Sequence, residues 1–430
     1  MFSSPPASER GRETRRQAAK SRYPSRKQEG GKPVTPAARL QTAIEILDAI
    51  AAAAREGGAP ADAIVAEAMR ARRYAGSKDR RAIRAHVYDA IRAVRSAPVS
   101  GRAAMLPLAD RDAALAALFD GSPYGPAPIA ADEPRAETGL AAPALTDLFD
   151  PLVDAGKEGA AMLARAPLDL RANRIRSTRD DLSALFPEGE AIPGAPDGWR
   201  LPPETAAAQH PAHAEGRFEV QDAASQYASV ALDAAPGMAV IDLCAGGGGK
   251  TLAIASATAN GADILACDIN RARLRQLSPR AERAGATRIE TRLLDPGQEA
   301  AMLTDRRGQA DRVFVDAPCS GSGTWRRSPE LRWRLTPARL DRHVADQARL
   351  LDIGADLVAP GGKLLYAVCS IIAREGRAQV EDFLNRYPGW TADTNCLPGG
   401  IGRAAGAGML LTPGHDGCDG FFLARLSAPC

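Results

Sequence analysis

The sequence predicts an α/β protein with a mostly parallel sheet in its C-terminal half, preceded by a small α/β module and an all-helical domain. From Phe218 onward, short apolar runs alternate with helical segments, which is typical of a mostly parallel sheet. Residues 142–215 mix strand and helix signals, whereas residues 36–125 carry helical periodicity. A chain of 430 residues is long enough for two or three domains. We expect four parts, namely a disordered basic tail at 1–35, a helical domain with its linker at 36–140, the small module at 141–217 and the sheet domain at 218–430.

Composition narrows the class of protein. The hydrophobic content of 45% suits a globular protein, and no apolar run approaches the length of about 18 residues that a membrane span requires. Seven cysteines without close pairing do not form a disulfide framework, so we expect a reduced, cytoplasmic protein and, by default, a monomer. The net charge is only +3, but residues 1–35 hold nine Lys or Arg against three acids. This segment fits either a solubilising tail or an arm that contacts phosphates.

The helical domain begins with Thr35 as an N-cap and Pro36 in the first turn. Leu40, Ile44 and Leu47 then recur at helical spacing. Further helices are expected near 61–70 and near 113–119. Between them, Ser77 could cap another helix, which carries an apolar stripe at 83, 87, 91 and 94. Basic residues, which fit either a solvated face or an RNA contact, cluster at Arg70, Arg72, Arg73, Lys78, Arg80, Arg81 and Arg84. Residues 120–140, rich in Pro, Ala and Gly, suit a linker.

In the small module, the pattern predicts a helix at 145–155, a strand at 168–173 and a capped helix at 177–185. In the sheet domain, the apolar runs predict strands at 238–243, 264–268, 313–316 and 364–367. Helices are expected between them, near 250–258, 270–284 and 337–359.

A glycine-rich loop at 242–251 follows one strand and opens a helix, so its backbone can approach a ligand closely. A Walker phosphate loop would need a glycine where Cys244 stands, which leaves a nucleotide phosphate site as a weak alternative. Asp268 ends the next strand 22 residues beyond Gly246, where an acid can hold ribose hydroxyls or cap the next helix. Asp295, after the following apolar run, is placed to accept from an adenine amino group.

Two cysteines follow two separate apolar strands. Cys319 lies in Asp-Ala-Pro-Cys-Ser-Gly-Ser-Gly, and Cys369 lies in Tyr-Ala-Val-Cys-Ser. Ligands of open α/β sheets bind outside the carboxyl ends of the strands, so both thiols are expected to face one crevice. Two thiols beside a cofactor loop suggest covalent catalysis, although a buried structural thiol is the more common fate of a cysteine.

Tryptophan and arginine alternate just after Cys319, at residues 325–327 and 332–334. This arrangement offers phosphate contacts and a face for base stacking. The alternative is that the tryptophans pack in the core and the arginines are solvated.

Together these motifs resemble the RsmB (Fmu/Sun) family of S-adenosylmethionine-dependent RNA cytosine-5 methyltransferases. The match covers roughly 218–426. Residues 168–180 resemble the small module of that family, and 36–95 resemble, more loosely, the NusB-like helical domain of its ribosomal-RNA branch. The resemblance implies a Rossmann-like class I methyltransferase domain. The matching stretches are FEVQDAAS at 218–225, DLCAGGGGKT at 242–251, DAPCSGSGTW at 316–325, YAVCS at 366–370 and DGFFLARL at 419–426.

The resemblance also implies roles for single residues. Cys369 matches the nucleophile, Cys319 the cysteine that assists elimination, Asp316 the acid that bonds the target ring, and Lys250 a lysine at the target pocket. S-adenosylmethionine is the implied cofactor, RNA the implied partner, and no metal is expected. The positions that match cofactor contacts are Cys244, Ala245, Gly246, Gly247, Gly248, Gly249, Lys250, Asp268, Asp295 and Asp316.

Two departures from the family pattern occur. The glycine loop lacks the usual proline, and Val368 stands where threonine usually precedes the nucleophile. Neither change removes a backbone donor or the thiol, so we expect an active enzyme.

Three readings of the function follow. The main hypothesis is methylation of cytosine C5 in 16S ribosomal RNA, and the second is the same chemistry on tRNA. The third is an RNA-binding ribosome assembly factor with a vestigial site. A DNA cytosine methyltransferase would use the Pro-Cys thiol as nucleophile and would not need Cys369.

Overall fold

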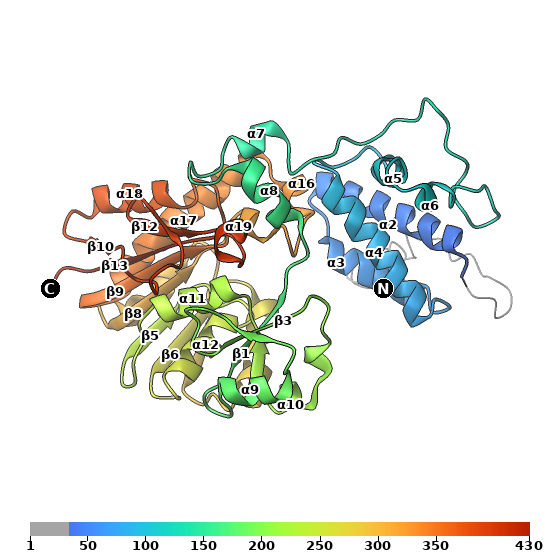
Figure 1. The fold of residues 1–430 in the computed structure, drawn as a ribbon. Helices are drawn as coiled ribbons and strands as arrows, with labels where there is room; N and C mark the ends of the chain where they lie inside the picture. Colours follow the sequence, from blue (N-terminus) through green and yellow to red (C-terminus); the bar gives the residue numbers. More distant parts are fainter. Residues whose placement is uncertain (1–33) are drawn as a thin grey trace, which may run out of the picture. The chain divides into compact units, whose positions relative to one another are not determined.

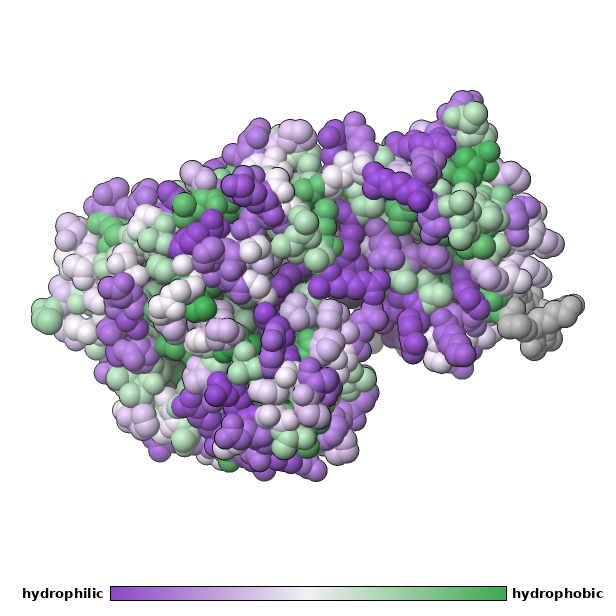
Figure 2. All heavy atoms as spheres, in the orientation of Figure 1, coloured by the Kyte–Doolittle hydropathy of each residue, from purple (hydrophilic) through white to green (hydrophobic). Residues whose placement is uncertain are grey.

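The structure, a computed structural model, describes residues 34–430, and the described residues fold into two compact units, 34–138 and 139–430 (Figure 1). The expected basic tail, except for its last two residues, lies outside the described residues. Within 34–430, no helix has both the length and the apolar character that crossing a membrane demands. On the face shown in Figure 2, hydrophilic side chains dominate and hydrophobic ones form small separate patches.

The described part of the first unit is helical. Thr35 caps its first helix as predicted, because its Oγ1 accepts from the backbone N–H of Ala38 at 3.2 Å. Leu40, Ile44 and Leu47 are buried where this helix packs against its neighbours. The helices are α2 (Pro36–Glu56), α3 (Ala61–Ala71), α4 (Ser77–Ala93), α5 (Gly101–Ala109) and α6 (Ala113–Ala116).

Helix α5 was not predicted from the sequence. Pro107 inside it masks the helical pattern, although Ser100 caps it by accepting from Ala103 N–H at 3.0 Å. Gly101 allows the close approach of α5 to α2, since a Cβ there would lie 2.1 Å from the carbonyl oxygen of Ile44. The predicted helix near 113–119 ends at 116, and the predicted Ser77 cap is wrong because Gly76 is the N-cap.

The basic residues of α3 and α4 divide by exposure. Arg72 is buried and pairs with Glu45 at 2.7 Å, and Arg80 is half-buried and donates to the carbonyl of Ala75 at 2.8 Å. The others are exposed, and Tyr74, between the two helices in the sequence, is 50% exposed. These five residues, called the basic patch below, are Arg70, Arg73, Lys78, Arg81 and Arg84.

The second unit begins with a small antiparallel sheet of order β2-β3-β1-β4. Its strand β1 (Leu168–Ala172) confirms the predicted strand, and β4 (Phe218–Val220) comes from beyond residue 217. The remaining elements are β2 (Glu190–Ala191), β3 (Gly198–Leu201), α7 (Pro143–Thr146), α8 (Ala155–Leu163), α9 (Arg179–Leu185), α10 (Pro211–Ala214) and η1 (Ala207–Gln209).

Two helix predictions in this region need correction. The helix expected at 145–155 is absent: α7 ends at Thr146 and α8 starts at Ala155. Pro151 lies between them and disfavours helical backbone at the residue before it. Helix α9 is capped by Thr178, one residue later than the predicted start at Ser177, and Asp181 accepts from Thr178 N–H at 2.7 Å.

The large sheet has the order β11-β12-β13-β9-β8-β5-β6-β7, with β10 on β13 (Figure 1). Its central strands are parallel, which confirms the predicted class, whereas β13 runs antiparallel to β9. The strands are β5 (Ala239–Asp242), β6 (Asp263–Asp268), β7 (Ile289–Leu293), β8 (Ala310–Asp316), β9 (Val358–Val368), β10 (Thr391–Asp393), β11 (Arg403–Ala405), β12 (Gly408–Leu411) and β13 (Phe421–Ser427).

Helices cover both faces of this sheet, so its central strands are apolar on both sides. Along β8, Val313 and Val315 join the core under α17 and α18, and Phe314 joins the opposite core with α11 and α12. The predicted helix at 270–284 is divided into α13 and α14. The helices are α11 (Ala223–Ala231), α12 (Gly249–Ala257), α13 (Arg271–Leu274), α14 (Leu277–Ala284), α15 (Glu299–Met302), α16 (Leu331–Arg334), α17 (Pro337–Leu357), α18 (Arg377–Arg386) and α19 (Pro413–Asp416), with short 3-10 turns η2 (Thr304–Arg306) and η3 (Ser322–Thr324).

The strand order determines where a ligand can bind. From β5 the chain continues to β6 and β7 on one side, and β8 and β9 then add on the other side. The carboxyl ends of β5 and β8 therefore flank the switch point, where open α/β sheets bind their ligands.

Candidate active site

A cleft of about 1100 Å³ opens at this switch point. The glycine loop lines one side of it, and the loops after β8 and β9 line the other. Most residues that the sequence singled out lie together here, namely Cys244, Ala245, Gly246, Gly247, Gly249, Lys250, Asp268, Asp316, Cys319 and Cys369.

Gly248 and Asp295 are not among the residues that line the cleft. Gly248 has φ +83° at the start of α12, and a Cβ there would lie 2.1 Å from Cδ1 of Leu277. Gly248 therefore allows the glycine loop to pack against α14. Asp295 is exposed, and its neighbours Leu294 and Glu299 line the cleft instead.

The glycine loop is fixed to the neighbouring strand by Asp268. One carboxylate oxygen of Asp268 accepts from Gly246 N–H at 2.7 Å, and the other accepts from Asn270 N–H at 2.6 Å. Gly246 has φ +55°, and a Cβ there would meet no atom within 4 Å. The loop thus leaves open space on its cleft side, which a side chain would fill and a ligand can occupy.

Asp242, the last residue of β5, was missed as a site residue. It is fully buried, and its Oδ2 accepts from Thr251 Oγ1 at 2.7 Å, whereas its Oδ1 has no hydrogen-bond partner among the described residues. Burial raises the pKa of Asp242 to about 7, against the hydrogen bond from Thr251, which lowers it. The sequence did hold a signal for Asp242, since this acid directly follows three apolar strand residues.

Lys250 and Asp316 form an ion pair inside the cleft. Their Nζ and Oδ2 atoms are 2.7 Å apart, and the ammonium lies 5.2 Å from the ring centre of Phe421. Burial opposes the charge of Lys250, but the Asp316 carboxylate and the Cys369 sulfur outweigh it and raise the pKa of Lys250. The pair therefore presents a fixed cation and a fixed carboxylate to a bound ligand.

The two thiols meet, as the sequence predicted. The Sγ atoms of Cys319 and Cys369 are 3.3 Å apart, and both cysteines are free. The hydrogen bond with Cys369, followed by burial, raises the pKa of Cys319 well above that of a free thiol. Cys319 thus keeps its proton at neutral pH, beside the sulfur of Cys369.

Of the two interpretations of the Trp-Arg segment, the structure supports packing of the tryptophans in the core. Trp325 is only 1% exposed and packs against Phe149, with ring centres 5.7 Å apart, and Trp333 is also buried. Arg332 and Arg334 are buried as well. Apolar packing therefore outweighed the surface pattern that alternating Trp and Arg had suggested.

Arg326 and Arg327 instead brace the loop after Cys319. Asp222 accepts from Nη2 of Arg326 at 2.8 Å and from Nη2 of Arg327 at 2.6 Å. Asp419 accepts from Nε of both arginines, at 2.9 Å from Arg327. Both carboxylates line the cleft, Asp419 buried and Asp222 half-buried, so this cluster ties the cysteine loop to the starts of α11 and β13.

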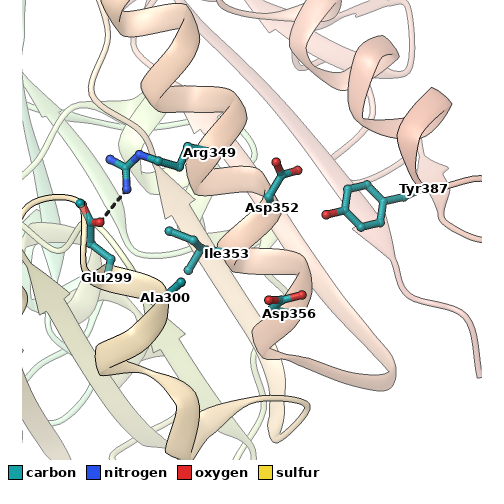
Figure 3. A pocket seen from close by; sticks show the side chains of 8 residues that line it. Glu299, Ala300, Arg349, Asp352, Ile353, Asp356 and Tyr387 are labelled. Atoms are coloured by element: carbon teal, nitrogen blue, oxygen red, sulfur yellow. Dashed lines mark hydrogen bonds and ion pairs between the residues drawn. The ribbon is translucent and has the colours of Figure 1, made fainter.

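A second ion pair forms the wall between the cleft and a smaller pocket of about 210 Å³. Glu299, 2% exposed, accepts from Nη1 of Arg349 at 2.7 Å, and both residues line both cavities. Figure 3 shows this pair, with Asp352 and Asp356 on the same helix and Tyr387 across from Asp352. Glu299 carried no sequence signal, because it lies outside every motif.

Comparison with known proteins finds a family match for part of the chain. Residues 229–427 match the family described as 16S rRNA methyltransferase RsmB/F. A curated relative from Synechocystis sp., named probable ribosomal RNA small subunit methyltransferase B, is 37% identical over 270 residues. That alignment covers 60% of this chain and 59% of the relative, so the chain spans less than two thirds of the relative's length.

Solved structures share the fold. PH0851 aligns with a TM-score of 0.68 and 23% identity, over 92% of this chain and all of that chain. NSun6 from Pyrococcus horikoshii with SFG aligns with a TM-score of 0.57 and 18% identity, over 64% of this chain and 94% of that chain. At these identities the likeness concerns the fold alone.

Proposed function

We propose that the protein methylates C5 of cytosine in 16S ribosomal RNA, on the premise that residues 229–427, which match the family described as 16S rRNA methyltransferase RsmB/F, form a methyltransferase domain of that family. The observation that carries the proposal is the pair of thiols 3.3 Å apart, beside the Lys250–Asp316 ion pair, in a cleft that the glycine loop completes. The name of the curated relative supports ribosomal RNA as the substrate class.

S-adenosylmethionine fits the residues of the glycine-loop side. The loop leaves open space at Gly246, Asp268 lies at the end of β6 with lone pairs left for ribose hydroxyls, and Asp242 offers an unpartnered oxygen. Family members take their methyl group from this cofactor, and NSun6 was solved with SFG. When bound, S-adenosylmethionine supplies an electrophilic methyl group on a sulfonium sulfur.

Cys369 is the proposed nucleophile. Cytosine C5 is a weak nucleophile in the intact ring, but a thiolate that adds to C6 makes C5 enamine-like. In that addition the S–C6 bond forms and the C5–C6 double-bond electrons become available at C5. Cys369 lies at the carboxyl end of β9, where its sulfur faces the cleft.

Asp316 and Lys250 hold the target ring. The Asp316 carboxylate can accept from the exocyclic amine or from protonated N3, which stabilises the electron-rich ring after addition. Lys250, 2.7 Å from Asp316, holds that carboxylate in place. The base must leave its stack to reach these groups, at a cost of a few kcal/mol.

Cys319 acts in the elimination. After methylation, the S–C6 bond breaks and the departing Cys369 sulfur takes the proton of Cys319; the Cys319 thiolate formed in this way accepts the C5 proton, and the electrons of the C5–H bond restore the double bond. The Cys319 thiol, in contact with the Cys369 sulfur, is placed to return a proton to Cys369 as it leaves. This assignment matches the raised pKa of Cys319, which suits a proton donor better than a nucleophile.

The first unit is proposed to bind RNA as a NusB-like domain. Its basic patch offers five exposed cations, and Tyr74 of the same helical region is also exposed, which suits phosphate and base contacts without sequence preference. We place the reaction in the cytoplasm and the active species as a monomer.

Two cysteine variants test the mechanism. When RNA contains 5-fluorocytidine, C5 carries fluorine where a proton would have to leave, so elimination stops. The enzyme then stays covalently bound to the RNA through the S–C6 bond. Cys319→Ala should keep this covalent complex and Cys369→Ala should lose it, as seen on a denaturing gel. Loss in Cys319→Ala only would assign the nucleophile to the Pro-Cys thiol and overturn the proposal. Trapping with tRNA but not 16S RNA would change the substrate, and S-adenosylmethionine binding without trapping on either RNA would favour the assembly factor.

A further inference from the structure

A buried glutamate lies between the two cysteine loops. Glu375 is 0% exposed, although an acid is rarely found fully buried without partners that satisfy it. Its carboxylate contacts the residue that follows each cysteine, Ser320 after Cys319 and Ser370 after Cys369. Glu375 therefore contacts the residue next to each of the two thiols.

The hydrogen bonds use both carboxylate oxygens. Oε1 accepts from Ser320 N–H at 2.8 Å and from the Gln347 side chain at 3.2 Å. Oε2 accepts from the hydroxyls of Ser320, at 2.5 Å, and Ser370, at 2.6 Å. Four donors from two loops and one helix thus converge on a single carboxylate, which an ionised acid can satisfy and a neutral amide cannot.

Neighbouring contacts hold this carboxylate and the loops in register. The Tyr366 hydroxyl donates to the backbone carbonyl of Glu375 at 2.6 Å, and Gln347 also donates to the carbonyl of Pro318 at 3.0 Å. Ser322 Oγ lies 2.9 Å from Ser370 Oγ and accepts from Ile371 N–H at 3.0 Å. The Glu375 position is therefore determined by β9 and α17 as well as by the loops.

We propose that Glu375 is a positioning residue that holds the two thiols at their 3.3 Å separation, so that Cys319 is within reach of the Cys369 sulfur when the S–C6 bond must break. Glu375 does not line the cleft and acts through Ser320 and Ser370. The inference rests on the proposed function for its catalytic consequence, but the distance it sets can be measured without RNA.

The test compares Glu375→Gln with a matched control, Glu158→Gln. Glu158 is also buried and accepts from a hydroxyl, Thr412 Oγ1 at 2.7 Å, and a backbone N–H, Gly414 at 2.6 Å, away from the cysteine loops. Diamide, a thiol oxidant, should bridge Cys319 to Cys369 quickly in the wild type and in the control. Bridging, measured by mass spectrometry of tryptic peptides, should slow roughly tenfold or more in Glu375→Gln. Alkylation of the exposed Cys430 should be equal in all three proteins.

The kinetic expectation is a kcat that falls roughly 100-fold in Glu375→Gln, since misplacement by about 1 Å can reduce rates this much. The KM for RNA and the affinity for S-adenosylmethionine should stay at the wild-type level. Unchanged bridging in Glu375→Gln would overturn the proposal, whatever the activity. A loss of cofactor binding and of folded protein in step with kcat would also overturn it, because that pattern describes a purely structural role. If the wild type bridges as expected but transfers no methyl group, the proposed function fails and the positioning role stands.

Discussion

Replacing Asp242 with Asn tests the electrostatics of the cleft floor. Asp242 is fully buried, with one oxygen bonded to Thr251 and the other without a partner among residues 34–430. Asparagine has the same shape and can still accept from Thr251, but it has no titratable proton. The substitution therefore removes the pH dependence that Asp242 gives to folding.

The size of this dependence follows from the shifted pKa. The folded-state pKa is about 7, against an ordinary value of 3.8, a difference of about three units. At 1.36 kcal/mol per unit, the contribution amounts to about 4 kcal/mol. Because the folded state holds the proton more tightly, stability is greatest below pH 3.8 and falls as the pH rises through 7. About one pH unit above the folded-state pKa the contribution no longer changes.

Denaturant unfolding at pH values from 4 to 8 measures this effect. All four tryptophans, at 199, 325, 333 and 390, lie in the second unit, so their fluorescence reports on the unit that contains the cleft. The stability of the wild type relative to Asp242→Asn should fall by about 4 kcal/mol between pH 4 and 7. Any penalty from the buried amide is independent of pH and cancels in this comparison. A constant difference across the range would refute the reasoning and mean that Asp242 ionises normally.

Three further sets of substitutions have distinct expected outcomes. Lys250→Met leaves the carboxylate of its partner without a cation, so kcat should fall roughly 100-fold while cofactor affinity, measured by calorimetry, changes little; a kcat near the wild-type value would exclude Lys250 from the chemistry. Gly248→Ala places a Cβ against Leu277 at positive φ and should reduce the unfolding free energy by about 2–4 kcal/mol, whereas Gly237→Ala, also at positive φ but in open space, should lose only about 1 kcal/mol. Equal losses would mean that backbone strain alone matters. Trp325→Ala should destabilise the protein by about 3–5 kcal/mol, and Trp325→Phe should bind RNA like the wild type, in filter-binding assays; weakened RNA binding by the Phe variant would restore a stacking role.

Much of the fold could be predicted because the relevant signals are local. The buried strands β5, β6, β8 and β9 read as short apolar runs, and the long helix α17 begins with Thr336 and a proline in its first turn. Two of the failed predictions involve proline: Pro107 lies inside a real helix, and Pro151 divides a stretch that looked helical. Proline's local preference decides only the second case, since in the first case tertiary packing retains a helix that contains it.

The residues of the candidate site that lie within sequence motifs could be predicted. Cys319, Cys369 and the glycine loop lie at strand ends, and the sheet topology brings strand ends together whatever their distance in sequence. Glu375 and Glu299 could not be found this way, because their importance lies in contacts across loops that no spacing encodes.

The burial of the Trp-Arg segment depends on partners distant in sequence. Trp325 packs against Phe149, and Arg326 pairs with Asp222 and Asp419. A segment rich in Trp and Arg is compatible both with an RNA-binding surface and with a core stabilised by ion pairs. Only the arrangement of these partners in space distinguishes the two.

The most direct test of the proposed function is transfer of a labelled methyl group from S-adenosylmethionine to total RNA from cells that lack this protein, followed by mapping of 5-methylcytosine. The account predicts label at a cytosine of small-subunit ribosomal RNA, and no label with Cys369→Ala. Label in tRNA would retain the chemistry and contradict the substrate. Absence of label from free RNA and from ribosomal subunits, with the cofactor bound normally, would contradict the account.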